Sequence, residues 1–222
     1  MLRQRWWKIV CVILLLYTFI AGFLGPVPAL PILNETIRNF YFHVAMWFCM
    51  MIFFVISVIY SIKYLRKSDP VFDIYALEYA KAGILFGCLG LVTGSLWAGI
   101  TWNAYWSNDP KQLGAVVALL IYLAYLILRN SMPDMDKRAR IGAVYNIFAF
   151  AMLFPTLWII PRMVESLHPG GLGSNPAFGG EDARMGRIFW FAAMPGWTLL
   201  GVWITTLRIR LQLLHDKGSY HA

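Results

Sequence analysis

Residues 42–64 read FHVAMWFCMMIFFVISVIYSIKY, an almost unbroken apolar run whose one formal charge is at Lys63. A helix needs about 20 mostly apolar residues to cross a hydrocarbon core about 30 Å thick, so this stretch predicts a transmembrane helix. Five further segments meet the same test. The six predicted spans are Trp7–Leu24, Phe42–Tyr64, Tyr79–Thr101, Leu113–Leu128, Ile141–Ile160 and Ile188–Leu207. The predicted fold class is therefore all-α, a polytopic membrane protein with a single membrane domain over residues 1–222.

The composition agrees with a membrane protein. With 59% hydrophobic and 14% charged residues and a mean hydropathy of +0.61, the chain has too little polar surface to cover a soluble globule. Its net charge of +8 does not indicate nucleic-acid binding, because the basic residues stand in short clusters between apolar runs. The three cysteines, Cys11, Cys49 and Cys88, form no CxxC or CxxCH pattern, which argues against a disulfide, a zinc site or covalent heme attachment.

The distribution of basic residues predicts the orientation. Of the 19 Lys and Arg residues, 14 fall on the side of the N-terminus and five on the other side, so we expect both termini to be cytoplasmic. The three predicted outer loops are then residues 25–41, 102–112 and 161–187. We interpret the first apolar stretch as a retained helix, because it is longer than a typical signal-peptide core and lacks a clean small-x-small cleavage site.

The most informative stretch is residues 93–111, TGSLWAGITWNAYWSNDPK, where the third span leaves the membrane. Its four large rings are Trp97, Trp102, Tyr105 and Trp106. An interfacial aromatic belt is one explanation, because Trp and Tyr favour the headgroup region. The interleaved Gly, Ser, Thr, Asn and Asp residues favour another, a folded loop that presents flat rings to a large planar ligand.

Two histidines are predicted at the same depth as this tryptophan-rich loop. His43 begins the second span and His168 lies in the third outer loop, whereas His215 and His221 fall in the cytoplasmic tail, where we expect them to be solvated. A lone interfacial histidine is more often structural than a ligand. A pair of neutral imidazoles, however, would supply both axial ligands of a heme iron.

The outer loops also contain charged residues that suit a heme site. Heme propionates require cationic partners, and the candidates are Arg38, Lys111, Arg162, Arg184 and Arg187, each of which is alternatively a solvated loop charge. Asp109 either orients a ligating imidazole or caps the helix that begins at Pro110.

Taken together, these residues resemble the CcmC branch of the CcmC/CcmF/CcsA family of heme-handling membrane proteins. The signature of that family reads approximately TGSxWGxxxWGxWWxWDxR. The matching positions are Thr93, Gly94, Ser95, Trp97, Trp102, Trp106 and Asp109, together with the pairs His43-Val44 and Leu167-His168. Tyr105 and Asn108 stand where the family usually has Trp, Lys111 where it has Arg, and Ala45 where it has Pro.

The resemblance implies a protein without turnover chemistry that holds heme b transiently and non-covalently. The heme would lie at the periplasmic face of a bacterial inner membrane, between His43, His168 and the tryptophan-rich (WWD) loop. The expected partners are membrane lipid, the heme chaperone CcmE, the ABC transporter pair CcmA/CcmB and the small protein CcmD. Two alternatives remain open: a component of a CcsA-type cytochrome c synthase, and a small transporter whose aromatic loop is only an interfacial belt.

Overall fold

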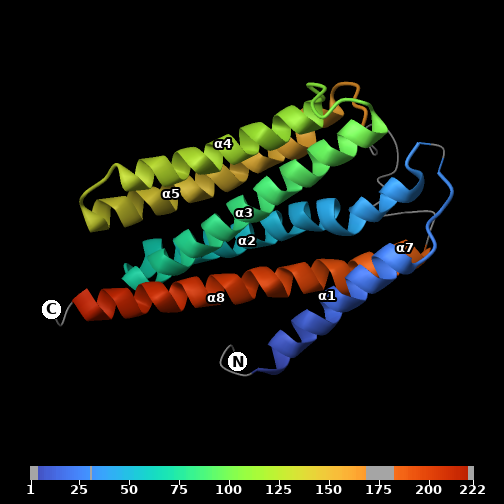
Figure 1. Cartoon of the computed structure of the whole chain (residues 1–222). Coiled ribbons are helices and arrows are strands. Elements are labelled where there is room, and N and C mark those ends of the chain that lie inside the picture. The colour runs from blue at the N-terminus through green and yellow to red at the C-terminus, as the bar shows by residue number, and fades with distance from the viewer. Residues whose placement is uncertain (1–4, 31, 169–182, 220–222) are drawn as a thin grey trace.

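The computed structural model describes residues 5–30, 32–168 and 183–219, with side chains placed as far as residue 215 (Figure 1). All regular structure in these residues is helical, and six helices are long and apolar enough to cross a membrane. The prediction of an all-α chain with six membrane-spanning helices is therefore confirmed. The Pro- and Gly-rich part of the third predicted outer loop and His221 lie outside the described residues.

The long helices are α1 (Trp6–Leu24), α2 (Phe40–Lys67), α3 (Pro70–Thr101), α4 (Pro110–Asn130), α5 (Met135–Leu153) and α8 (Met194–Ser219). Short segments complete the bundle: the 3-10 helices η1 (Asn34–Asn39) and η3 (Ile160–Arg162), the π-helices η2 (Phe154–Ile159) and η4 (Phe189–Ala193), and α7 (Ala183–Ile188). The η2 and η4 segments continue α5 and precede α8, so the fifth and sixth predicted spans each contain a π-helical stretch.

Three helices begin before the predicted apolar spans, and at each start an aspartate side chain caps the helix: Asp69 at α3, Asp109 at α4 and Asp134 at α5. Helix α3 begins at Pro70 rather than at Tyr79, since the Asp69 carboxylate accepts a 2.9 Å hydrogen bond from the Val71 N–H and proline suits the first helical position. Helix α8 likewise continues past the expected Leu207. In α3, α4 and α5 the apolar stretch marks the part that suits lipid, while a capping aspartate sets the start of the helix.

The central layer consists of α2 and α3, with the α4–α5 pair on one side and the α1–α8 pair on the other (Figure 1). Small residues allow the central helices to approach closely; Gly83, for example, lies against the Phe54 ring. Phe54 in turn stacks on Tyr122 of α4 with ring centroids 3.5 Å apart. The described segments that follow α1, α3 and α5 gather at one end of the bundle, so the described parts of the three predicted outer loops lie at the same end.

Candidate functional site

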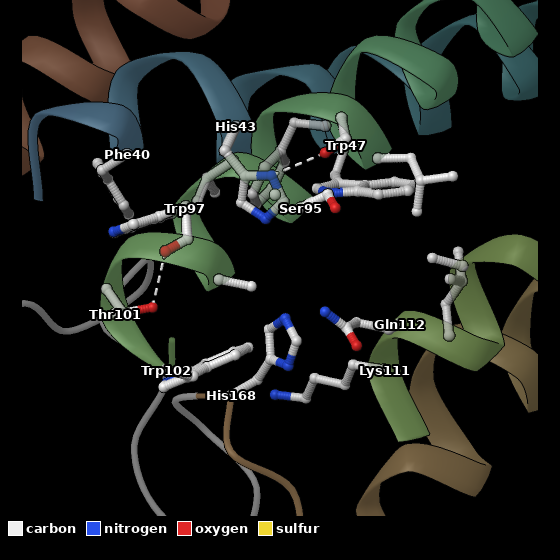
Figure 2. A pocket seen from close by; sticks show the side chains of 18 of the residues that line it. Phe40, His43, Trp47, Ser95, Trp97, Thr101, Trp102, Lys111, Gln112 and His168 are labelled. Carbon is white, nitrogen blue, oxygen red and sulfur yellow. Dashed lines mark hydrogen bonds between the residues drawn. The ribbon is translucent and has the colours of Figure 1, made fainter. Parts of the chain in front are cut away.

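A cavity of about 370 Å³ opens at the end of the bundle where these segments meet (Figure 2). Its volume lies in the usual range for small-molecule sites. Aromatic rings form much of its wall: Phe40, Trp47, Phe48, Trp97, Trp102, Trp106 and Trp158. The polar lining residues are His43, Ser95, Thr101, Lys111, Gln112 and His168. The cavity thus combines flat apolar surfaces with a few polar groups.

His43 is held by the central helix pair. Its Nδ1 lies 2.9 Å from the backbone carbonyl oxygen of Gly90 on α3. Because a carbonyl oxygen only accepts hydrogen bonds, Nδ1 carries the proton and Nε2 keeps a lone pair. Trp97 and Trp47 meet the imidazole edge-to-face, with ring centroids 5.8 and 6.1 Å away.

His168 has the same tautomer for a different reason. Its Nδ1 lies 2.8 Å from an oxygen of the Asp109 carboxylate, so Nε2 again keeps its lone pair. Burial lowers the pKa of His168 below its usual value even though Asp109 opposes the shift, which favours the neutral ring at neutral pH. Figure 2 shows the His43 and His168 rings facing one another across the cavity.

Asp109 accepts hydrogen bonds from four groups. It caps α4 through the Lys111 N–H at 2.9 Å, and it also receives the Leu167 N–H at 2.7 Å, the Ser166 hydroxyl at 2.9 Å and the His168 Nδ1–H. Burial alone would raise the pKa of Asp109, but these hydrogen bonds and the neighbouring His168 hold it below its usual value. Asp109 therefore performs both roles considered from the sequence, capping α4 and orienting an imidazole.

The tryptophan-rich stretch spans the end of α3, which carries Trp97, and the short turn to α4, which carries Trp102, Tyr105 and Trp106. The Trp97 Nε1–H donates to the Thr36 hydroxyl of η1 at 3.0 Å, and the Trp106 Nε1–H donates to the Asn108 side chain at 2.7 Å. Trp97, Trp102 and Trp106 all line the cavity. Tyr105 does not; its side chain is 65% exposed and its ring lies against Gly99.

The basic residues predicted as propionate partners lie in different places relative to the cavity. Lys111 lines the cavity beside His168. Arg38 instead donates to the carbonyl oxygens of Gly22 and Gly25 and pairs with Glu35. Arg162 stacks on Trp158, and Arg184 donates to the Pro26 carbonyl at 2.6 Å. Among the described candidates, Lys111 is the cation that the structure brings to the cavity, while Arg187 lies in α7.

Sequence reasoning missed several lining residues. Trp47 follows His43 by four positions and therefore shares its helix face, a signal that could have identified it. Gln112 follows Lys111 directly at the start of α4. No sequence pattern indicated Trp158, because the direction of its side chain depends on the π-helical turn of η2.

This fold and site define a class of protein, a multi-pass helical membrane protein whose cavity presents two imidazoles among tryptophan rings. The chain belongs to the CcmC family, described as heme exporter protein C, which matches residues 2–216. It is similar to heme exporter protein C of Paracoccus denitrificans, with 21% identity over 180 residues, 81% of this chain and 74% of that protein.

Two other relatives match over shorter stretches. Heme exporter protein C of Bradyrhizobium diazoefficiens is 30% identical over 115 residues, 51% of this chain and 43% of that protein. Cytochrome c biogenesis protein CcsA of Welwitschia mirabilis is 33% identical over 98 residues, 43% of this chain and 32% of that protein. In both cases the chain matches less than half the length of the relative.

Proposed function

We propose that this protein binds heme b non-covalently between His43 and His168 and delivers it during cytochrome c biogenesis. The observation that carries the proposal is that the His43 and His168 rings face one another across the cavity, each with its Nδ1 on an oxygen acceptor, which leaves Nε2 for a ligand. Porphyrin nitrogens already fill four positions on heme iron, so two imidazoles complete its coordination. A bare zinc ion would need further protein ligands.

The rest of the cavity fits the same cargo. The rings of Trp97, Trp102 and Trp106 offer flat apolar surfaces to the porphyrin, and the ammonium group of Lys111 suits a propionate. Asp109 would increase the electron donation of His168 to iron, as carboxylate partners of ligating histidines do. No bond between protein and porphyrin is required, so the heme can be passed on.

The cellular location and the partners are part of the proposed function. The site would lie on the periplasmic side of a bacterial inner membrane, and the acceptor would be the heme chaperone CcmE, with CcmA, CcmB and CcmD as associates. The protein would act by binding and transfer rather than by turnover. The support is membership of the CcmC family and the gathering of the loops after α1, α3 and α5 at the end that holds the cavity.

The test of heme binding is the visible absorption spectrum of the detergent-purified protein. We expect a Soret band typical of six-coordinate heme, which is lost or shifted in His43→Ala and in His168→Ala. His215→Ala is the matched control, because His215 lies on α8 outside the cavity, and it should leave the spectrum unchanged. If the wild-type protein stays free of heme when it is produced with added heme, the proposal fails and the aromatic loop is an interfacial belt.

The similarity to CcsA favours one second candidate, a component of a cytochrome c synthase. The heme-loaded protein, mixed separately with apo-CcmE and with a reduced CxxCH-containing apocytochrome, distinguishes the two functions. Transfer to CcmE alone supports delivery. Covalent attachment to the apocytochrome in the absence of CcmE would instead assign the synthase role.

A further inference from the structure

The two imidazoles are fastened to the protein in different ways. His43 stands on the long helix α2, its Nδ1–H is bound to the Gly90 carbonyl of the adjoining helix, and Gly94 lies directly against its ring. Rotation of this ring would require α2 and α3 to separate. His168 lies instead in the non-helical segment after η3, and its side chain remains 24% exposed.

A single carboxylate fastens the segment that carries His168. One oxygen of Asp109 accepts from the Lys111 N–H and from His168 Nδ1–H, while the other accepts the Leu167 N–H at 2.7 Å and the Ser166 hydroxyl at 2.9 Å. Asp109 thus connects the start of α4 to three consecutive residues, 166–168. Trp102 adds an edge-to-face contact with the His168 ring at 4.8 Å.

We propose that Asp109 is a positioning residue that would hold His168 on the heme iron, and that heme release begins when this contact opens while His43 still holds the iron. The inference rests on the proposed function. In the release step the dative bond from His168 Nε2 to iron breaks and its electron pair stays on the nitrogen. A donor atom of the acceptor would then supply an electron pair to the vacated position. The bond from His43 Nε2 to iron would break last, with its electron pair left on the nitrogen, so the oxidation state of the iron would not change.

The heme reduction potential distinguishes a positioning role of Asp109 from a role that only stabilises the fold. A carboxylate that accepts the Nδ1–H makes the imidazole a stronger donor, which stabilises ferric over ferrous iron. Loss of this carboxylate should therefore shift the heme reduction potential to more positive values. It should also weaken the iron–His168 bond and hasten release.

Asp109→Asn is the informative variant. Asparagine still caps a helix, but its NH2 group donates hydrogen bonds, so it cannot accept on both sides as the carboxylate does. Asp69→Asn is a close match as a control, because Asp69 also precedes a proline at a helix start and also accepts a 2.9 Å bond from the N–H two residues on. It lies at the other end of α3 from the cavity.

The experiment measures the reduction potential of the heme-loaded protein and the rate of heme transfer to apomyoglobin. We expect Asp109→Asn to have a more positive potential and a release rate on the order of tenfold to a hundredfold higher, the usual effect of losing such a partner. Ser166→Ala should raise the release rate by a smaller factor. Asp69→Asn should match the wild type.

A double variant tests whether Asp109 acts through His168. In a His168→Ala background, Asp109→Asn should not change the affinity for added hemin further, whereas it should lower that affinity in a His43→Ala background. If six-coordinate wild-type heme is found but Asp109→Asn behaves as Asp69→Asn does, this inference is wrong while the proposed function stands. If the wild type binds no heme, the proposed function itself has failed.

Discussion

Gly94 of α3 lies directly against the imidazole of His43 on α2, so that a Cβ at position 94 would come within 2.4 Å of the ring atom Cε1. Atoms do not approach so closely without a shift. Glycine at this position therefore sets how His43 lies between Trp97 and Trp47 and how its Nδ1–H meets the Gly90 carbonyl.

Gly94→Ala should weaken heme binding more than it weakens the fold. The added methyl group displaces the His43 ring, while the higher helix propensity of alanine offsets part of the packing cost by about 1 kcal/mol. The measurements are hemin affinity and thermal unfolding in detergent. Gly186→Ala is the matched control, because no atom lies within 4 Å of a Cβ at that position. Unchanged hemin affinity in Gly94→Ala would contradict a ligand role for His43.

The sequence was sufficient to predict the six long helices. A helix that crosses a bilayer needs a minimum length and an apolar composition, and both can be read from the sequence. It was less informative about their ends. The start of α3 at Pro70 depends on capping by Asp69 in a polar stretch that has no apolar signal. The sidedness inferred from Lys and Arg residues stays a prediction.

Site residues could be predicted from the sequence where a residue type has few common roles in a membrane protein. Histidine, tryptophan and aspartate stand out in an apolar chain, and the structure brings His43, Trp102 and His168 to one cavity. Arginine is less informative, because its guanidinium group also binds backbone carbonyl oxygens at helix ends. Arg38 does so at Gly22 and Gly25, which no local pattern indicates.

Lys111→Met should lower the affinity for hemin about tenfold, equivalent to about 1.4 kcal/mol, because a charge-assisted contact with a propionate is lost. Arg38→Met is the matched comparison and should leave the affinity unchanged, since Arg38 does not line the cavity. The dimethyl ester of heme has no propionate charge, so wild type and Lys111→Met should bind it equally. An equal loss for hemin and its ester would contradict propionate recognition by Lys111.

Gly114→Ala should distort the wall of the cavity by moving η2. A Cβ at Gly114 would lie 2.1 Å from the Thr156 backbone carbonyl oxygen, and a backbone atom cannot rotate away as a side chain can. We expect a loss of stability of about 1–3 kcal/mol and weaker heme binding, because Leu157 and Trp158 of η2 line the cavity. Thermal unfolding and hemin titration check this. Wild-type behaviour in both assays would show that the close contact is not required.

An ion pair joins α3 and α4 at the end of the bundle opposite the cavity. Arg129 donates to both oxygens of the Asp73 carboxylate, at 2.8 and 2.7 Å, and the two side chains are 4% and 16% exposed. Parallel double contacts of this kind are among the stronger side-chain hydrogen bonds.

Arg129→Met should destabilise the protein by up to about 3 kcal/mol, because it leaves the mostly buried Asp73 carboxylate without its partner. The double variant Asp73→Leu with Arg129→Met removes both charges and should recover much of that loss, since no unpaired charge remains. Unfolding of the detergent-solubilised proteins measures both effects. Hemin affinity should stay at the wild-type value in the double variant, because the pair lies at the far ends of α3 and α4 from Trp97 and Lys111. If the double variant were less stable than Arg129→Met alone, the unpaired Asp73 carboxylate would not be the cause of the loss.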